Sequence, residues 1–246
     1  MRRLFERLRR RKHASPFEVS PRVAERAASF LLEMDEALEQ IGELPGLDEF
    51  GRTRRVPPRM FPLLQDALGA FDRYVKTMVD GSELEVRCSL GCAACCHHEQ
   101  MGVQAIELLN IYLSYRGFSD YLVIQDRIRE LATQRDRLPC PFLEVATKRC
   151  RIYLARPISC RMHLAVTDPD WCRPDHSRAA EAVTHDLAPP DAILAIMKQI
   201  AQRLGLDQLS PILMPGLDML GSKVLQGREI ELRAELRRRG RGVSSR

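Results

Sequence analysis

Eight cysteines are the residues of this chain with the clearest chemical potential. All of them lie between residues 88 and 172 of the 246-residue sequence, and four fall within nine consecutive positions. Cysteines separated by two or three residues can ligate one metal, because a single backbone turn brings their sulfurs together. The predicted metal ligands are Cys88, Cys92, Cys95, Cys96, Cys140, Cys150, Cys160 and Cys172.

The nature of the metal follows from the donor type. Four thiolates suffice for one 4Fe–4S cluster or for one all-sulfur zinc site, and sulfur ligands serve both metals. We favour an iron–sulfur cluster, with zinc as the alternative. Eight cysteines fill two four-ligand sites, or one site with bystanders, and spacing leaves both arrangements open. Disulfides are disfavoured, because Cys95-Cys96 would form a strained vicinal bridge and the expected compartment is reducing.

Other residues next to the cysteines are candidates for supporting roles. His97 and His98 follow the first group, and His163 follows Cys160, so each is either a mixed-site ligand or a surface residue.

The Arg156-Pro157 step also has two interpretations. Proline fixes φ and turns the chain before Cys160, and Arg156 and Arg161 can donate hydrogen bonds to thiolate or sulfide sulfurs. The alternative is that Arg156 pairs with a nearby carboxylate such as Glu144.

The spacing of Cys88, Cys92 and Cys95 also matches the C-x3-C-x2-C pattern of radical S-adenosylmethionine enzymes. Those enzymes follow the pattern with a β/α series, whereas the chain here indicates helices and irregular loops. Cys96 would also occupy the iron position that must stay open. We therefore do not favour this mechanism. The sequence shows no glycine-rich phosphate loop and no G-x-S-x-G motif.

Charge is distributed unevenly along the chain. The formal net charge is +5, but residues 1–12 carry +6 and residues 228–246 carry +4, which leaves −5 for the residues between them. A mildly acidic body with basic ends does not indicate a nucleic-acid surface, apart from weak, salt-sensitive contact by the tails. No secretory signal and no apolar stretch of about 20 residues is present, so we expect a cytoplasmic protein without a membrane span.

Hydrophobic periodicity predicts a mainly helical chain. Ser20-Pro21 is typical of a helix start, and Gly46 and Asp80-Gly81 are typical of helix ends. Strand-like alternation is nearly absent, so the predicted fold class is all-α, with loops at 45–59 and an irregular region at 138–174. The predicted helices cover residues 21–43, 60–79, 103–115, 119–137, 176–186, 190–204 and 217–238.

The ordered motifs resemble those of a known family. The runs Cys88-x3-Cys92-x2-Cys95-Cys96, Cys140-Pro141-Phe142-Leu143 and Cys150-x-Ile152-Tyr153-x2-Arg156-Pro157-x2-Cys160-Arg161 are similar to those of the YkgJ-type cysteine-cluster proteins, described as zinc- or iron-chelating domains. The likeness spans about residues 86–165, and Cys172 lies beyond it. The resemblance implies metal binding and, in some members, an iron–sulfur cluster. It extends distantly to flagellin lysine N-methylases, which are longer proteins.

Together these features predict a helical single domain with a central irregular cysteine-rich metal-binding region. The expected parts are a basic tail at 1–20, a helical pair at 21–80, the cysteine-cluster domain at 81–175, C-terminal helices at 176–238 that pack on it, and a tail at 239–246. The predicted function is metal binding through an iron–sulfur cluster, with an unidentified protein or redox partner, for redox or methyl-transfer chemistry. The alternatives are a zinc-stabilised non-catalytic module and an S-adenosylmethionine-dependent protein lysine methyltransferase. No catalytic residue is assigned, and whether the protein is an enzyme stays open.

Overall fold

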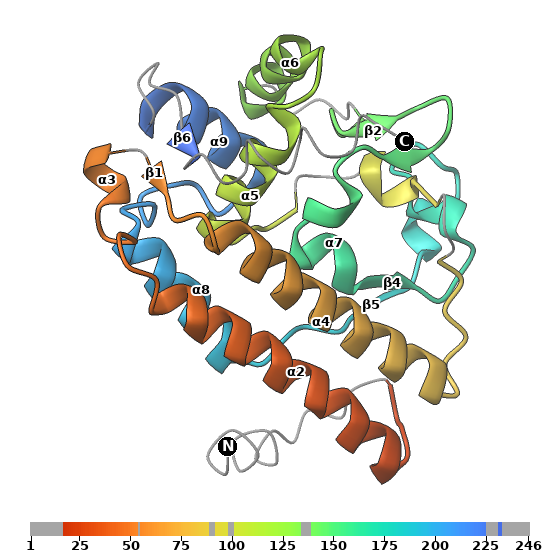
Figure 1. Cartoon of the computed structure of the whole chain (residues 1–246). Coiled ribbons are helices and arrows are strands. Elements are labelled where there is room, and N and C mark those ends of the chain that lie inside the picture. The colour runs from red at the N-terminus through yellow and green to blue at the C-terminus, as the bar shows by residue number, and fades with distance from the viewer. Residues whose placement is uncertain are drawn as a thin grey trace, which may run out of the picture.

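The computed structural model describes residues 17–53, 55–88, 92–97, 101–133, 139–224 and 231–232, and Figure 1 shows a mainly helical chain. The α-helices are α2 (Pro21–Gly42), α3 (Phe50–Thr53), α4 (Met60–Gly81), α5 (Ala105–Tyr115), α6 (Tyr121–Thr133), α7 (Ile158–Met162), α8 (Asp191–Arg203) and α9 (Leu213–Asp218). The strands are β1 (Arg55–Val56), β2 (Leu143–Glu144), β3 (Arg149–Cys150), β4 (His163–Ala165), β5 (Thr184–Asp186) and β6 (Glu231–Leu232). Short 3-10 helices are η1 (Ala94–His97), η2 (Tyr153–Ala155), η3 (Pro169–Cys172) and η4 (Ala179–Glu181), and η5 (Met219–Val224) is a π-helix.

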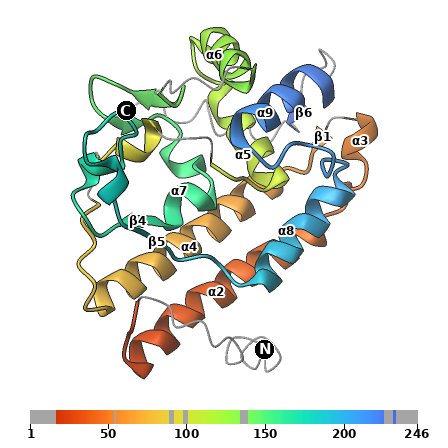
Figure 2. The same ribbon diagram turned by 180° about the vertical axis from the view of Figure 1, so that it is seen from behind.

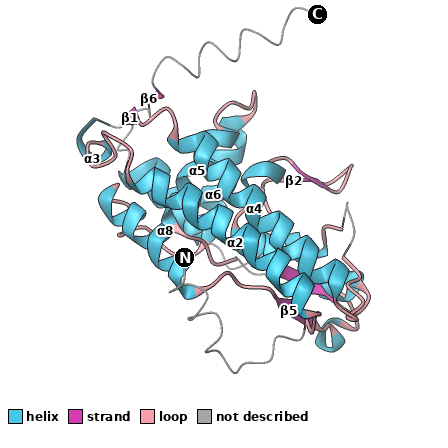
Figure 3. Ribbon diagram, turned by 60° about the horizontal axis from the view of Figure 1, so that its bottom comes forward, coloured by secondary structure: helices cyan, strands magenta, loops and turns pink. Residues whose placement is uncertain are grey.

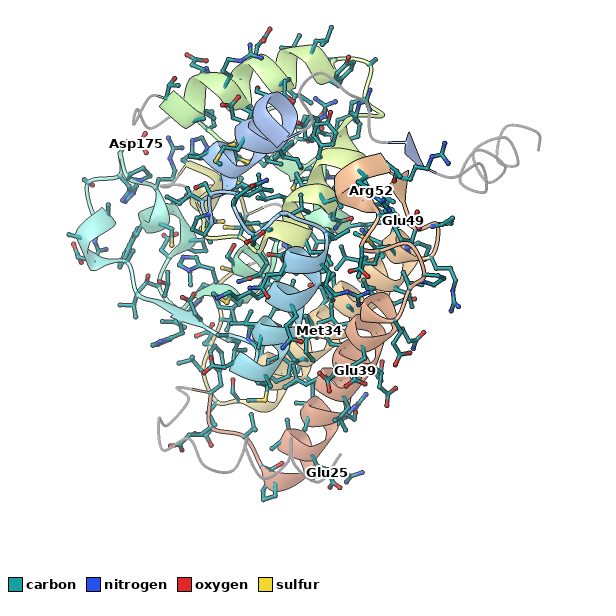
Figure 4. All side chains as sticks on the ribbon, turned by 90° about the vertical axis from the view of Figure 1, so that its left-hand side faces the viewer. Glu25, Met34, Glu39, Glu49, Arg52 and Asp175 are labelled. Atoms are coloured by element: carbon teal, nitrogen blue, oxygen red, sulfur yellow. The ribbon has the colours of Figure 1, made fainter. Side chains whose placement is uncertain are left out.

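Helices α2 and α4 lie side by side and form the longest packed pair (Figure 1). The Ser20 side chain accepts a hydrogen bond from the Val23 amide, and Pro21 occupies the first turn, as the sequence predicted. Apolar positions at helical spacing on both helices are buried against each other. In Figure 4, Met34 lies where α2 meets α8, whereas Glu25 and Glu39 point outwards from α2.

The C-terminal helices complete the core. Helix α8 packs on α2 and α5, and α9 packs on α5 and α6. Gly216 on α9 allows a close approach, because an added Cβ there would lie 2.6 Å from a methyl carbon of Leu108 and 2.6 Å from the Ser210 carbonyl oxygen. No helix in the described part of the chain is both long and apolar enough to span a membrane.

The all-α prediction holds in part, because the described chain is mostly helical but also contains three two-stranded sheets. Strands β2 and β3 pair antiparallel, β4 and β5 pair antiparallel, and β1 and β6 pair parallel. Figure 3 shows them as short magenta segments beside the cyan helices. Strands of two or three residues carry too few positions to show alternation, so hydrophobic periodicity does not predict them. The segments predicted as loops, 45–59 and 138–174, contain short helices as well as short strands. These are α3, β1, β2, β3, η2, α7, β4 and η3.

Four predicted helices agree closely with α2, α4, α5 and α8. The predicted helix at 119–137 corresponds to α6, and residues 134–138 lie outside the described residues. The helix predicted at 176–186 is wrong: η4 and β5 occupy that segment, because Thr184–Asp186 pair with β4 instead. The helix predicted at 217–238 begins earlier, at Leu213, because Pro215 is tolerated in a first turn, and it continues as η5 to Val224. The prediction is wrong at Glu231–Leu232, which form β6 and pair with β1, and residues 225–230 and 233–238 lie outside the described residues.

The segments that carry the cysteines lie together on one side of the helices. In Figures 1 and 2, η1, the β2–β3 hairpin, α7 and the β4–β5 pair gather away from α8 and α3. Residues 1–16, 98–100 and 233–246 lie outside the described residues, and with them His98 and most of both predicted basic tails. The predicted division into five segments stays a prediction.

Candidate metal centre

Cys88 is fixed to strand β4 by two hydrogen bonds. The Arg87 amide donates to the Ala165 carbonyl at 2.8 Å, and the Ala165 amide donates to the Cys88 sulfur at 3.1 Å. Residues 82–88 therefore form an extended segment that runs to β4 rather than a strand of their own. A backbone N–H that points at a sulfur stabilises negative charge on it, as a thiolate ligand requires.

Helix η1 carries the adjacent pair Cys95 and Cys96. The Cys96 amide donates to the Ala93 carbonyl at 3.0 Å, and the Cys96 carbonyl accepts from the Cys140 amide at 2.8 Å. The second of these hydrogen bonds joins the first cysteine group to the second across 44 positions of sequence. The fold therefore brings the segment of Cys95 and Cys96 next to the segment of Cys140.

The second cysteine group is anchored in the main core by Phe142. This ring is 1% exposed and lies 5.5 Å, between centroids, from the ring of Tyr115 on α5. Leu143 is the pairing partner of Cys150 in the β2–β3 hairpin, so Cys140 and Cys150 are held at the base of one hairpin. The Cys140-Pro141-Phe142 motif thus combines a candidate ligand with the residue that fixes its position.

Cys160 lies on α7, whose first turn is held by a buried carboxylate. Glu107 of α5 is 1% exposed, and its two oxygens accept from the Ile158 amide at 2.7 Å and from the Gln104 amide at 2.9 Å. The carboxylate therefore satisfies free N–H groups at the starts of two helices at once. Burial raises the pKa of Glu107 to about 7, although both amides and Arg161 act to lower it.

Arg161 secures α7 from the other side. Its guanidinium donates to the Arg156 carbonyl at 2.8 Å, to the Leu154 carbonyl at 2.7 Å and to the Asp72 carboxylate on α4. The Arg161 side chain is 1% exposed. Its burial strengthens these charge-assisted hydrogen bonds. Arg161 positions Cys160 by binding backbone carbonyls and a carboxylate, and it uses these donors on groups other than sulfur.

Arg156 pairs with Asp72 as well, at 3.7 Å, rather than with Glu144. The sequence suggested Glu144 because it is near in the chain, but Asp72 reaches Arg156 from α4. The guanidinium also lies 4.2 Å from the Tyr153 ring centroid. Among the described residues, the buried Nε of Arg156 has no hydrogen-bond partner. Arg156 therefore keeps one buried N–H that is not used within the described residues.

Cys172 is the most buried of the eight cysteines, at 4% exposed, and it lies on η3 against η1. Asp168 begins η3 by accepting a hydrogen bond from the Asp170 amide at 3.0 Å. Cys172 packs with Ala94 and Ala165, and the small side chains of these residues leave room for Cys88 and Cys92 beside them.

All eight cysteines are free thiols. Cys88 with Cys92, and Cys95 with Cys96, form two hydrogen-bonded pairs. Cys88 donates to Cys92, which lowers the pKa of Cys92 to about 6 and raises that of Cys88 far above its usual value. Cys96 donates to Cys95, which lowers the pKa of Cys95 to about 7 and raises that of Cys96. Each pair therefore readily forms one thiolate, the form that binds metal.

Burial governs the remaining thiols. It raises the pKa of Cys140 to about 12 and also raises the pKa of Cys150, Cys160 and Cys172. The positive charge of Arg156 acts against this rise at Cys150 and Cys160. Neutral thiols are the expected state of such groups without metal, because several neighbouring thiolates would repel one another.

His163 is a candidate histidine with a carboxylate partner. Its Nδ1 lies 2.9 Å from Asp186 across the β4–β5 pair, and this hydrogen bond raises the pKa of His163. An imidazole held by a carboxylate at one nitrogen is the usual arrangement of a histidine ligand, so His163 stays a candidate. His97 is part of η1, and its ligand role likewise stays a prediction.

The donor set fits a thiophilic metal, because it combines soft sulfur ligands with an unpaired arginine N–H and a backbone N–H aimed at Cys88. Within the described residues, no group of three or more His, Cys, Asp or Glu side chains is placed to hold a metal ion. The eight-cysteine ligand set stays a prediction.

Comparison with known proteins gives one match, and it covers the segment that carries the cysteines. Residues 87–183 match the family model CxxCxxCC, "Putative zinc- or iron-chelating domain". No curated protein and no solved structure matches the chain. The matched range holds all eight cysteines and extends past Cys172, which lay outside the motifs recognised in the sequence. The match supports metal binding by this segment, and its description covers zinc and iron alike.

Sequence reasoning missed the residues that hold the ligands in place. Glu107 and Asp72 contact α7, which carries Cys160, and Asp186 contacts His163, which follows α7 in β4. The one available signal was Glu107, a charged residue within the apolar run 105–113. A carboxylate inside such a run is rarely buried without partners, so it indicates a specific role.

Proposed function

We propose that this protein binds an iron–sulfur cluster through its clustered cysteines and uses it in redox or methyl-transfer chemistry, with a protein redox partner. The feature that supports the proposal is a set of eight free thiols, most of them on or beside η1, the β2–β3 hairpin, α7 and η3, segments that lie on one side of the helices. A reducing cytoplasm is the compartment in which such thiols stay available for metal.

The surroundings of the thiols support iron and sulfur over a single ion. A cluster with bridging sulfides adds negative charge that a zinc ion does not, so it needs nearby hydrogen-bond donors. The Arg156 Nε–H is buried and unpartnered among the described residues, and the Ala165 amide already donates to a sulfur. When bound, the cluster would supply one-electron transfer, and Cys88 through Cys96 with the later cysteines would hold it. This chain's own residues position and shield those ligands.

Metal analysis tests the proposal. The protein would be purified without oxygen, its visible spectrum recorded, and its iron, acid-labile sulfide and zinc measured. We expect a coloured protein with iron and sulfide in equal amounts. A colourless protein with stoichiometric zinc and no sulfide would contradict the iron–sulfur assignment. Cys95→Ser should lose metal, and Ser159→Ala on α7 serves as a control that leaves every thiol in place.

A zinc-stabilised, non-catalytic module is the second candidate. It is favoured by the close integration of two cysteine segments into the core, since Phe142 ties the Cys140 segment to α5, and Glu107 and Arg161 tie α7 with Cys160 to α5 and α4. Structural zinc sites are closed in this way. The same metal analysis separates the two candidates. A zinc protein would keep its metal in air, whereas an iron–sulfur protein would lose colour and sulfide.

Protein lysine methylation is a third candidate, and it rests on the resemblance of the cysteine motifs alone. Incubation of the anaerobic protein with labelled S-adenosylmethionine and a cell extract would test it. Transfer of label to a protein acceptor is the expected result. Transfer that persists in a Cys95→Ser variant would show that the methylation does not depend on the cysteine site. Absence of transfer by the metal-loaded protein would count against this activity.

A further inference from the structure

The β2–β3 hairpin projects from the body of the protein. Residues 144–149 are all exposed, and Figures 1 and 2 show the hairpin at the outer edge of the molecule. Val145, in the turn of the hairpin, is 65% exposed. Of the seven large apolar side chains that are exposed in the described part of the chain, five lie between residues 121 and 154. Exposed apolar surface is therefore concentrated around this hairpin.

The base of the hairpin is bonded to segments that carry other exposed apolar side chains. Arg151 donates two hydrogen bonds to the Asp120 carboxylate, both at 2.7 Å. The exposed side chains of Leu122 and Val123 follow Asp120 at the start of α6, and Leu154 on η2 follows Arg151. The contact between Arg151 and Asp120 therefore brings α6, the hairpin and η2 together.

The hairpin also carries positive charge that the fold does not neutralise. Lys148 and Arg149 are exposed, and neither forms a salt bridge with a described residue, whereas Arg151 pairs with Asp120. The register places Glu144 opposite Arg149, so the exposed turn has two cations and one carboxylate. Residues 13–227 as a whole carry a net charge of −5. A positive site on an acidic body is complementary to carboxylates of a partner.

The turn is held in one conformation before any partner binds. Lys148 has a φ of 54°, in the left-handed region that is unfavourable for residues with a Cβ. The Thr147 hydroxyl donates to the Glu144 carboxylate within the turn, and the Arg151 amide donates to the Phe142 carbonyl at 2.8 Å at the base. A preorganised hairpin loses little conformational freedom when it binds.

The hairpin lies next to candidate metal ligands. Cys150 is part of β3 and pairs with Leu143, and the Cys140 amide donates to the Cys96 carbonyl at 2.8 Å. A protein bound to the hairpin would therefore contact the segment that holds two candidate ligands. An electron would then have a short path between that protein and a cluster.

Resting on the proposed redox function, we propose that the β2–β3 hairpin docks a small acidic electron-transfer protein. Val145 contacts an apolar surface of this partner, and Lys148 and Arg149 pair with carboxylates around it. Electron-transfer complexes are weak and bury less than about 1,200 Å² in total, so a hairpin and its surroundings provide enough surface.

Binding of an acidic 2Fe–2S ferredoxin to the anaerobically purified full chain tests the docking site. Titration calorimetry at several salt concentrations should show binding that weakens as salt rises. Lys148→Gln/Arg149→Gln and, separately, Val145→Ser should each weaken it about fivefold or more. The control Lys198→Gln/Arg52→Gln removes the same charge from exposed positions on α8 and α3, away from the hairpin, and should bind as the wild type does.

Three outcomes would overturn the docking site. The first is no binding, or equal binding by the wild type and both hairpin variants. The second is a dimer in sedimentation of the chain alone that Val145→Ser dissociates, because the hairpin would then bind a second copy. The third is hairpin-dependent binding to phosphatidylserine vesicles that exceeds binding to the ferredoxin, because the surface would then fit a membrane.

Reduction experiments separate the docking site from the proposed function. A photoreduced deazaflavin should bleach a cluster in the wild type and in every variant, because it needs no protein surface. Reduced ferredoxin should bleach it more slowly in the two hairpin variants than in the wild type or the control. A chain without iron and sulfide that still binds ferredoxin through the hairpin would overturn the iron–sulfur proposal and support the docking surface.

Discussion

Glu107 should make the stability of this protein fall as the pH rises. Its carboxyl group has a pKa of 4.5 when unfolded and about 7 when folded, because burial disfavours the charged form. The unfolded state therefore releases this proton at lower pH than the folded state does. The stabilisation is fully present below pH 4.5 and is lost as the pH rises through about 7.

The size of the effect follows from the two pKa values. A difference of 2.5 pH units at about 1.4 kcal/mol per unit gives about 3 kcal/mol, most of it between pH 5 and 8. Glu107→Gln removes the titration. The amide oxygen can accept from one of the two backbone amides, and its NH2 group faces the other, which costs about 1–3 kcal/mol.

Urea unfolding of the wild type and of Glu107→Gln at several pH values between 5 and 8 measures both terms. The variant should be less stable at pH 5, and the gap should narrow by about 2–3 kcal/mol by pH 8. Other titrating groups, such as His163 and the thiols, are shared by the two proteins and cancel in the difference. Parallel curves for the two proteins across this range would refute the reasoning.

Three further changes test how the candidate site is supported. Phe142→Ala should cost about 3–5 kcal/mol and reduce metal retention, measured by urea unfolding and metal analysis, because the ring is the core anchor of Cys140. Asp72→Asn should cost about 1–3 kcal/mol, because it leaves the buried Arg161 guanidinium without its counter-charge. Gly216→Ala should lower the melting temperature, whereas Gly42→Ala, where an added Cβ meets nothing within 4 Å, should not.

Each of these has an outcome that contradicts it. Full metal retention by a destabilised Phe142→Ala protein would show that the Phe142 ring is not needed to hold Cys140 in place for metal binding. An Asp72→Asn protein as stable as the wild type would mean that Arg161 is satisfied by the two carbonyls alone. Equal melting temperatures for the two glycine variants would show that α9 can shift away from α5 without cost.

Sequence and structure agree where the signal is local. Helices α2, α4, α5 and α8 were predicted because apolar residues recur at helical spacing over more than ten positions. Segment 176–186 was predicted as a helix from the same kind of signal, but β5 forms there because β4 offers a pairing partner. A partner 21 residues earlier in the chain cannot be recognised from the segment itself.

The candidate site shows the same division. Residue type and spacing identified the cysteines, since several thiols at short intervals are unusual whatever the fold. The residues that support them could not be identified, because Asp72 contacts Arg161 across 89 positions and Glu107 contacts Ile158 across 51. Glu144 was suggested as the partner of Arg156 because it is near in sequence, but Arg156 pairs with the distant Asp72 instead.

The long sequence separation between Cys88 and Ala165 bears on the order in which the protein assembles. Contact between them closes a loop of 77 residues, whereas α2 and α4 are neighbours in sequence and can pair early. Loop closure of this kind is slow, and Cys172 is synthesised last among the ligands. We therefore expect the helical pair to form first on the growing chain and metal to load only after translation has passed residue 186, when β5 can pair with β4.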